Sequence, residues 1–96
     1  MSSPEQRVVN NADQRQYELW LDDQRIGLAD YSINDDVITI PHVETAPTHR
    51  GRGYAAALLD GVVADARQHN LQIRPVCPYA ASYMRQRPDT HDLLAR

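Results

Sequence analysis

The sequence predicts a small α/β (α+β) domain, in which helices flank a mixed, mostly antiparallel sheet. Three observations predict it. Short strand-like segments separated by turn signals fill the first half of the chain. A long amphipathic helix pattern follows over residues 54–70. One more strand-like segment comes after the helix, and a strand–helix–strand unit implies a parallel crossover.

The length and composition indicate one compact domain. The chain has 96 residues, of which 42% are hydrophobic and 24% are charged, and these are ordinary values for a globular protein. With no Phe, one Trp and five Tyr, the core must be mostly aliphatic. We expect residues 1–6 to form a disordered tail and residues 7–96 to form the domain, as a monomer or a weak homodimer.

The first half of the chain alternates strand-like and turn-like segments. Strands are expected at residues 7–10, 16–21, 25–32 and 37–40, the first of them as a short edge strand. Clusters of Asp and Asn between them, at residues 22–24 and 34–36, are typical of turns. Pro41 predicts a bulge or an edge position, after which the chain can continue extended to Thr45.

The helix after Tyr54 has the clearest pattern in the sequence. Its apolar positions recur with i, i+3, i+4 spacing at Ala55, Leu58, Leu59, Val62, Val63 and Ala66. Asn70 is a plausible stop signal. A strand is expected over residues 71–76, a shorter helix over residues 79–86 that ends at Arg87-Pro88, and one more helical turn over residues 89–95.

Charge and cysteine content exclude several classes of protein. The formal net charge is −3, which argues against a nucleic-acid protein with a broad basic face. Cys77 is the sole cysteine, so no intramolecular disulfide can form, and a lone thiol is typical of a reducing compartment. No apolar run approaches the roughly 20 residues that span a bilayer, and the N-terminus has no signal pattern. We therefore expect a cytoplasmic protein without nucleic-acid or membrane partners.

The segment from Pro47 to Ala55 lies between a predicted strand and the long helix. Its two glycines let the backbone approach a ligand closely, and a helix N-terminus offers free N–H groups and positive potential. Arg50 and Arg52 add charge that can bind phosphate oxygens. These features predict a phosphate site, and the alternative is an ordinary loop before a helix.

The same segment matches the pattern Arg/Gln-x-x-Gly-x-Gly/Ala, with Arg50, Gly53 and Ala55 in the fixed places. In this context it resembles the pyrophosphate-binding turn of the GCN5-related N-acetyltransferase superfamily. The chain is similar to the very short members of that superfamily, which carry His-x-Glu eight residues before the turn and Pro-x-Cys after the next strand. His42 and Glu44 occupy the first pair of positions, and Pro75-Val76-Cys77 matches the second motif.

A third short motif extends the resemblance to roughly residues 7–94. It is Arg-Pro followed by an acidic residue and then Asp-Leu, here Arg87-Pro88-Asp89 and Asp92-Leu93. One departure is that Pro41 and Val43 flank the histidine, where the short members often have Thr. The departure removes two hydroxyl groups but leaves His42 itself in place.

The resemblance implies that acetyl-coenzyme A binds as a substrate, and the spacing of the histidines and Cys77 predicts no metal site. The residues implied in coenzyme binding are Val43, Thr45, Arg50, Gly51, Arg52, Gly53, Tyr54 and Ala55, with the backbone of Val43 and Thr45 beside the pantetheine arm and the pyrophosphate on a helix that begins near Gly51. The remaining histidines at positions 49, 69 and 91 show no metal-ligand spacing with one another or with Cys77.

Four side chains are candidates for the chemical step. His42 or Glu44 could accept the proton of the amine, although either could also be an ordinary exposed strand residue. Cys77 could line the site or act as a nucleophile. Tyr83 lies at the offset where larger relatives place a Tyr that protonates the leaving thiolate, and Tyr79 competes with it for this role.

The resulting interpretation is an acetyl-coenzyme A-dependent N-acetyltransferase whose acceptor amine cannot be identified from the sequence. One alternative is a module that binds coenzyme A without transferring the acetyl group. Another is a small nucleic-acid or protein adaptor that uses Arg50 and Arg52, which the negative net charge disfavours.

Overall fold

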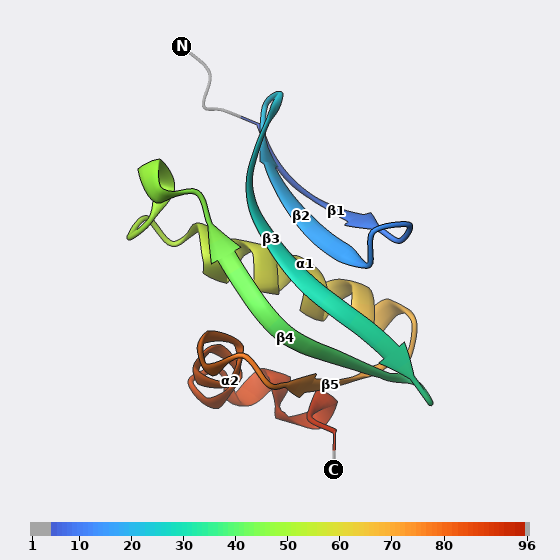
Figure 1. Cartoon of the computed structure of the whole chain (residues 1–96). Coiled ribbons are helices and arrows are strands. Elements are labelled where there is room, and N and C mark those ends of the chain that lie inside the picture. Colours follow the sequence, from blue (N-terminus) through green and yellow to red (C-terminus); the bar gives the residue numbers. More distant parts are fainter. Residues whose placement is uncertain (1–4, 96) are drawn as a thin grey trace.

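The computed structural model of the chain describes residues 5–95. Along the chain the elements are β1 (Gln6–Asn11), β2 (Gln16–Leu21), β3 (Gln24–Asn34), β4 (Val37–Thr45), the 3₁₀ helix η1 (Pro47–His49), α1 (Tyr54–Gln68), β5 (Gln72–Pro75), α2 (Pro78–Arg85) and the 3₁₀ helix η2 (Pro88–Leu93). They form one five-stranded sheet with the helices packed against it (Figure 1). None of the described helices is long and apolar enough to cross a membrane.

The sheet has the predicted mixed topology. Its strands lie in the order β1-β2-β3-β4-β5, and the first three pairings are antiparallel. β4 and β5 pair in parallel, because α1 carries the chain back between them. The fold class predicted from the sequence is therefore confirmed.

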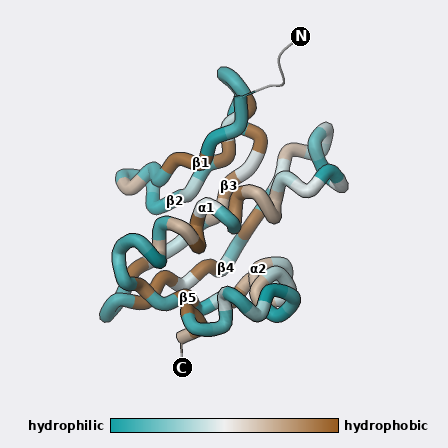
Figure 2. The backbone as a smooth tube through the Cα atoms, turned by 180° about the vertical axis from the view of Figure 1, so that it is seen from behind, coloured by the Kyte–Doolittle hydropathy of each residue, from teal (hydrophilic) through white to brown (hydrophobic). Residues whose placement is uncertain are grey.

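Both helices pack on one face of the sheet, which we call the covered face. The apolar stripe of α1 supplies Leu58, Leu59, Val62 and Ala66 to the core, as its spacing predicted. α2 adds Ala80, Tyr83 and Met84 to the same cluster. Figure 2, which views the molecule from the side of α1, shows the apolar segments concentrated in the strands and along the helix.

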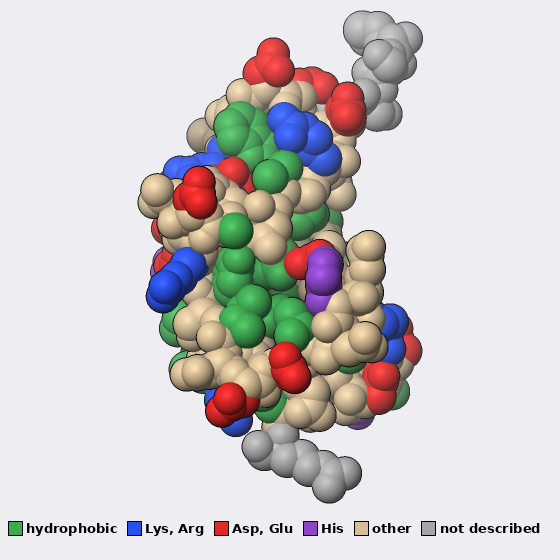
Figure 3. All heavy atoms as spheres, turned by 90° about the vertical axis from the view of Figure 1, so that its right-hand side faces the viewer, with side chains coloured by type: hydrophobic (Ala, Val, Ile, Leu, Met, Phe, Trp, Pro, Cys, Tyr) green, Lys and Arg blue, Asp and Glu red, His purple; other side chains and the backbone are tan. Residues whose placement is uncertain are grey.

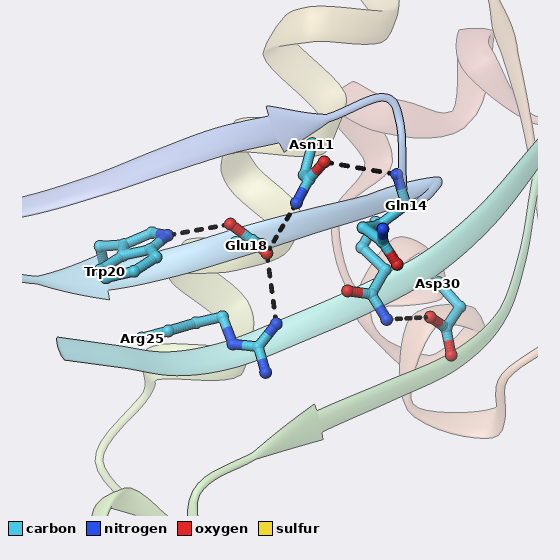
Figure 4. Close-up of polar contacts among 7 residues, drawn as sticks. Asn11, Gln14, Glu18, Trp20, Arg25 and Asp30 are labelled. Atoms are coloured by element: carbon cyan, nitrogen blue, oxygen red, sulfur yellow. Dashed lines mark hydrogen bonds and ion pairs between the residues drawn. The ribbon is translucent and has the colours of Figure 1, made fainter.

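The opposite side of the sheet, which we call the open face, carries polar side chains. Figure 4 views β2 and β3 from this side, with the helices behind the strands. Glu18 lies on this face, because its neighbours Tyr17 and Leu19 point into the core. Direct cross-strand partners share a face, so the pairings of Glu18 with Leu28, and of Leu28 with Glu44, form one row across the open face.

A bulge at Pro41 divides β4 into two parts. The register changes from Asp30↔His42 to Ser32↔Thr39, so three steps along β4 match two along β3, and the extra residue is on β4. On an uninterrupted strand His42 would share the face of the buried Ile40. The bulge instead places His42 on the open face, as the position of a proline within a strand had indicated.

Several boundaries differ from the sequence-based expectation. β3 is longer than expected at both ends, and η1 was not predicted. α1 begins at Tyr54 rather than near Gly51 and ends before Asn70, whose left-handed φ of 57° terminates it. β1 starts at Gln6, inside the expected tail, while residues 1–4 of that tail lie outside the described residues.

The edge of the sheet at β1 shows how closely α1 approaches. A Cβ added to Gly61 would lie only 2.6 Å from a methyl carbon of Val8, so only glycine fits here without a shift of β1. In Figure 3, apolar side chains form a band on this side of the molecule, flanked by charged groups. A cavity of about 220 Å³, lined in part by Val8, Tyr17 and Gly61, lies between the two elements.

Candidate functional site

The turn before α1 has a glycine backbone that is open to a cavity. Gly51 and Gly53 adopt φ values of 76° and 81°, which side-chain-bearing residues rarely adopt. Apart from the glycine itself and its two chain neighbours, no residue has an atom within 4 Å of the place where a Cβ would stand on either glycine, so the space above the turn is open. A ligand could therefore contact the backbone directly.

The first turn of α1 presents unused N–H groups to this space. The first helical hydrogen bond runs from the Ala57 N–H to the Gly53 carbonyl at 3.1 Å. Within residues 5–95, no side chain caps the helix at Gly53. The N–H groups of Tyr54 and the next two residues therefore remain available, and the dipole of a 15-residue helix favours an anion beside them.

A cavity of about 500 Å³ connects this turn with the end of β4. It is lined by His42, Val43, Glu44, Thr45, His49, Arg50, Gly51, Gly53, Tyr54, Ala55 and Tyr79. The structure therefore brings together most of the residues predicted from the sequence. The predicted residues outside this lining are Arg52, Cys77 and Tyr83.

The cavity exists because β5 separates from β4 halfway along. Their pairing stops at Ile40↔Pro75, and the N–H groups of Val76 and Cys77 both donate to the Ile40 carbonyl, at 3.1 and 2.9 Å. From Pro41 to Thr45, β4 continues without β5 and stays paired with β3 on its other side. The β5 side of this segment is therefore an unpaired strand edge that faces the cavity.

The backbone of this edge is oriented by the antiparallel ladder with β3. The Ala46 N–H donates to the Ile26 carbonyl at 2.7 Å, which places Ala46 among the hydrogen-bonded positions. Such positions alternate with positions whose N–H and C=O point away from the partner strand. Val43 and Thr45 therefore direct their peptide groups away from β3, and the Thr45 carbonyl accepts a hydrogen bond from Arg50 Nε at 3.1 Å.

His42 and Glu44 form the ionisable pair of the cavity. His42 Nε2 lies 3.7 Å from Glu44 Oε2, and both side chains are just over half exposed. They extend from the open face, and Asp30 stands directly across the ladder from His42. The pair can thus exchange protons with a ligand and with water.

Cys77 is buried at the N-terminus of α2, with 7% of its surface exposed. Its backbone N–H is part of the β4–β5 junction, and its side chain belongs to the core cluster. The position agrees with a packing role next to the cavity rather than with a freely accessible thiol.

The two candidate tyrosines of α2 lie in different surroundings. Tyr79 is 43% exposed and lines the cavity. Tyr83 is buried on the covered side, where its hydroxyl donates to Asp60 of α1 and the Arg87 guanidinium stacks on its ring at 4.0 Å. Burial first, and then the hydrogen bond to Asp60, raise the pKa of Tyr83 above its ordinary value, so this hydroxyl releases its proton poorly.

The motif near the C-terminus holds the helices together. Arg67 of α1 binds the Asp92 carboxylate at 2.8 Å and the Asp89 carbonyl at 3.0 Å, which attaches η2 to α1. Arg87 adds its contact with Tyr83. Arg87, Asp89 and Asp92 thus have structural contacts away from the cavity.

His49 is a cavity residue that the sequence reasoning considered only as a metal ligand. Its Nδ1 lies 2.9 Å from the Thr48 hydroxyl, and its ring meets the edge of Tyr54 at 5.8 Å. Its place beside Arg50 in the turn was the signal that could have identified it. Among residues 5–95, no three His, Cys, Asp or Glu side chains are grouped so that they could hold a metal ion.

A protein-family model described as GCN5-related N-acetyl-transferase matches residues 16–93. The chain belongs to this family. Membership supports acetyltransferase activity in general, and it agrees with the resemblance based on the turn at Arg50–Ala55 and the His42–Glu44 pair. No curated protein is significantly similar to the chain in sequence.

Solved structures with the same fold agree with the family assignment. A GCN5-like protein from Staphylococcus aureus has a TM-score of 0.72 and 23% identity, over 99% of this chain and 91% of its own. A protein of the GNAT family from Xanthomonas campestris pv. campestris has a TM-score of 0.65 and 17% identity, over 99% and 94% of the two chains. The ribosomal-protein-S18-alanine N-acetyltransferase from Escherichia coli has a TM-score of 0.64 and 14% identity, over 76% of this chain and 52% of its own.

Proposed function

We propose that the protein transfers an acetyl group from acetyl-coenzyme A to an amine. The observation that carries the proposal is the single cavity of about 500 Å³, which joins the glycine turn before α1 to the His42–Glu44 pair. One end has the backbone geometry for a pyrophosphate, and the other has the groups for a proton transfer. The family of the chain supports the same chemistry.

The coenzyme fits the cavity by its chemistry. Its pyrophosphate would lie over Gly51 and Gly53, where no Cβ intrudes and the first turn of α1 points its N–H groups. Arg50 adds a guanidinium at this end. The peptide groups of Val43 and Thr45, which face away from β3, would bind the amides of the pantetheine arm.

The acetyl transfer would take place at the end of the cavity that holds His42 and Glu44. The acceptor amine loses a proton to Glu44 or His42, and its nitrogen then attacks the thioester carbonyl. The new C–N bond forms as the C–S bond breaks, and the coenzyme leaves as a thiolate that must gain a proton. Free N–H groups of β4 are suitable donors to the developing oxyanion.

We assign the protonation of the thiolate to Tyr79 rather than Tyr83. Tyr79 lines the cavity and is 43% exposed, whereas the hydroxyl of Tyr83 is hydrogen-bonded to Asp60 on the covered side. We assign Arg52 no direct contact, because it does not line the cavity.

The direct test is calorimetric titration with acetyl-coenzyme A, followed by an amine panel in which released thiol is measured. Coenzyme at a hundred times its dissociation constant should stabilise the fold by roughly 2.7 kcal/mol. No binding at millimolar coenzyme would refute the proposal. Binding without transfer to any amine would support the alternative, a coenzyme A-binding module, which the exposure of His42 and Glu44 to water also favours.

Gly53→Val tests the turn. A β-branched side chain at φ 81° is strained and would fill the open space above the backbone, so coenzyme affinity should fall at least about tenfold. Asn70→Val is the matched control, because Asn70 has a φ of 57° at the other end of α1, far along the helix from the turn. Equal coenzyme affinity in the two folded variants would show that the turn is only structural.

Cys77→Ala separates direct transfer from a covalent route. Because Cys77 is buried, we expect the variant to keep most of its turnover and the wild type to form no acetyl-cysteine. Mass spectrometry of the wild type with acetyl-coenzyme A alone is the measurement. A stoichiometric acetyl group on Cys77 that an added amine removes would establish the covalent route instead.

A further inference from the structure

A second cavity, of about 290 Å³, adjoins the first at the end of β4. Arg25 and Leu28 of β3 line it, and it shares Glu44, Thr45 and Arg50 with the first cavity. Glu44, a proposed acceptor of the amine proton, therefore belongs to both cavities. A molecule in the second cavity can present an amine to Glu44 while the coenzyme occupies the first cavity.

The lining of the second cavity carries charges of both signs. Its guanidinium groups are those of Arg25 and Arg50, and its carboxylate is that of Glu44. Arg50 also lines the first cavity at the glycine turn, where we assign it to the pyrophosphate. Arg25, by contrast, lines the second cavity and not the first. A ligand complementary to this lining therefore has an amine for Glu44 and an anionic group for Arg25.

Arg25 is held in place by a buried carboxylate (Figure 4). Glu18 is only 7% exposed, and it accepts hydrogen bonds from Trp20 at 3.1 Å, from Asn11 at 3.3 Å and from Arg25 Nη1 at 3.2 Å. Burial would raise the pKa of Glu18, but these hydrogen bonds and the charge of Arg25 together bring the pKa below its ordinary value. The carboxylate is therefore ionised and anchors one nitrogen of the guanidinium.

The other nitrogens of Arg25 are free to bind a ligand. Apart from Glu18, the structure of residues 5–95 shows no hydrogen-bond partner for this side chain, which is 44% exposed. Nε and Nη2 thus keep their donors, which form a planar fork that matches the two oxygens of a carboxylate. A guanidinium that is already fixed at Nη1 loses little side-chain freedom when it binds such a group.

An apolar surface lies between the two charged ends of the site. Glu18, Leu28 and Glu44 follow one another as direct cross-strand partners in the row on the open face. Neighbouring strands are about 4.8 Å apart, so the Cα atoms of Glu18 and Glu44 are separated by roughly 10 Å. Leu28 is half-buried between them and belongs to the cavity lining. A short carbon chain that joins the amine to the anionic group of the ligand would lie over Leu28.

We propose that the acceptor is a small amino acid, whose carboxylate binds Arg25 in the second cavity while its amine lies beside Glu44. The inference rests on the proposed function, because the acetyl group has to be presented from the first cavity. The single charge of a carboxylate fits better than the double charge of a phosphate monoester, which Glu44 in the same lining would repel. The volume of about 290 Å³ lies just below the range of pockets for drug-sized ligands and suits a small molecule.

The test compares straight-chain amino acids, from glycine through β-alanine and γ-aminobutyrate to δ-aminovalerate, each with its own amide. Binding is measured by calorimetry on the protein saturated with coenzyme A, which has no acetyl group to transfer. Transfer is measured as thiol released from acetyl-coenzyme A. We expect at least one acid to bind at least about tenfold more tightly than its amide, as one hydrogen bond to a charged group predicts, and to be acetylated with a correspondingly higher kcat/KM.

Three variants assign the preference to Arg25. Arg25→Gln should bring the ratio of the two affinities close to one by weakening the acid. Glu18→Gln with Arg25→Gln should give the same ratio, and because it removes both charges of the pair, a fold weakened by an unpaired Glu18 cannot explain the result. Arg7→Gln is the matched control and should keep the full preference, because Arg7 stacks on Trp20 at 5.4 Å on the same face but does not line the cavity.

Equal affinity of the wild type for every acid and its amide would overturn the inference and leave the proposed function intact. A preference that survives in Arg25→Gln would also overturn it. So would a loss of coenzyme A affinity in that variant, because Arg25 would then serve the coenzyme, and so would acids that bind through Arg25 but are not acetylated. Failure of acetyl-coenzyme A to bind the wild type would count against the proposed function itself.

Discussion

The two faces of the sheet are made by alternate residues of the same strands, yet they differ in composition and in role. The covered face carries Leu19, Ala29, Ile38 and Ile40, all with at most 1% of their surface exposed. The open face carries His42 and Glu44, which are just over half exposed. On the covered face, packing against α1 and α2 buries the apolar side chains that stabilise the fold. The open face has no such helices over it and therefore leaves room for a ligand.

The bulge at Pro41 is the point where β4 changes from one role to the other. Before it, Ile38 and Ile40 pair beside β5 and enter the core. After it, the strand has no neighbour on the β5 side, and His42 reaches the open face. One inserted residue thus separates the segment that enters the core from the segment that lines the cavity.

The largest effect should come from His42→Ala. If the open face supplies the chemistry, turnover should fall about 10²- to 10⁴-fold, as for loss of a general base, while the melting temperature stays close to the wild-type value. His69→Ala is the control, because that ring is bound to Asp65 on α1. Unchanged turnover in the His42 variant would assign the proton transfer to Glu44.

Ile40→Ala tests the part of β4 that precedes the bulge and enters the core. Its side chain is 1% exposed, and its truncation should cost about 2–5 kcal/mol of unfolding free energy, measured by chemical denaturation. Ser32→Ala, at an exposed position of β3, should change stability by less than about 0.5 kcal/mol. Similar losses in the two variants would mean that the faces do not differ in their contribution to stability.

Tyr79 and Tyr83 of α2 allow the same comparison, between a cavity position and a core position, within one helix. Tyr79→Phe should lower turnover, on the order of 10²-fold, with little change in stability, because its hydroxyl is assigned to the leaving thiolate. Tyr83→Phe should instead cost about 1 kcal/mol of stability through the lost hydrogen bond to Asp60, and turnover should stay near the wild-type value. The reverse pattern would return the catalytic role to Tyr83.

The smallest effect concerns Glu18, the buried carboxylate of the open face. Its pKa is lowered below the ordinary value of 4.5 in the folded protein, so its contribution to stability is present above pH 4.5 and is lost as the pH falls through the folded pKa. Melting temperatures of the wild type and Glu18→Gln between about pH 3 and 7 measure it. We expect the advantage of the wild type to shrink on acidification, and a constant difference would contradict this.

Much of the fold could be predicted because local patterns and tertiary packing agree. The stripe from Leu58 to Ala66 and the turn residues between the strands each identified their elements. The turn at Gly51 and Gly53 was predicted because glycines before a helix let the backbone approach a ligand closely, and the structure adds that both adopt positive φ. Strand ends and η1 were less predictable, because cross-strand pairing and packing determine where such short elements begin and end.

By itself, the sequence determined the mixed sheet, the long helix and the glycine turn before it, since periodicity and glycine chemistry are local properties. Only the tertiary structure decided which side chains meet. It placed Tyr79 in the cavity and turned Tyr83 toward Asp60, although both belong to one predicted helix. It also placed Arg25 and Arg50 in the lining of one cavity, because pairing between β3 and β4 brings together parts of the chain that are far apart in sequence. The sequence alone could not predict these neighbours, because they depend on helix phase and strand register, which the packing of the whole domain determines.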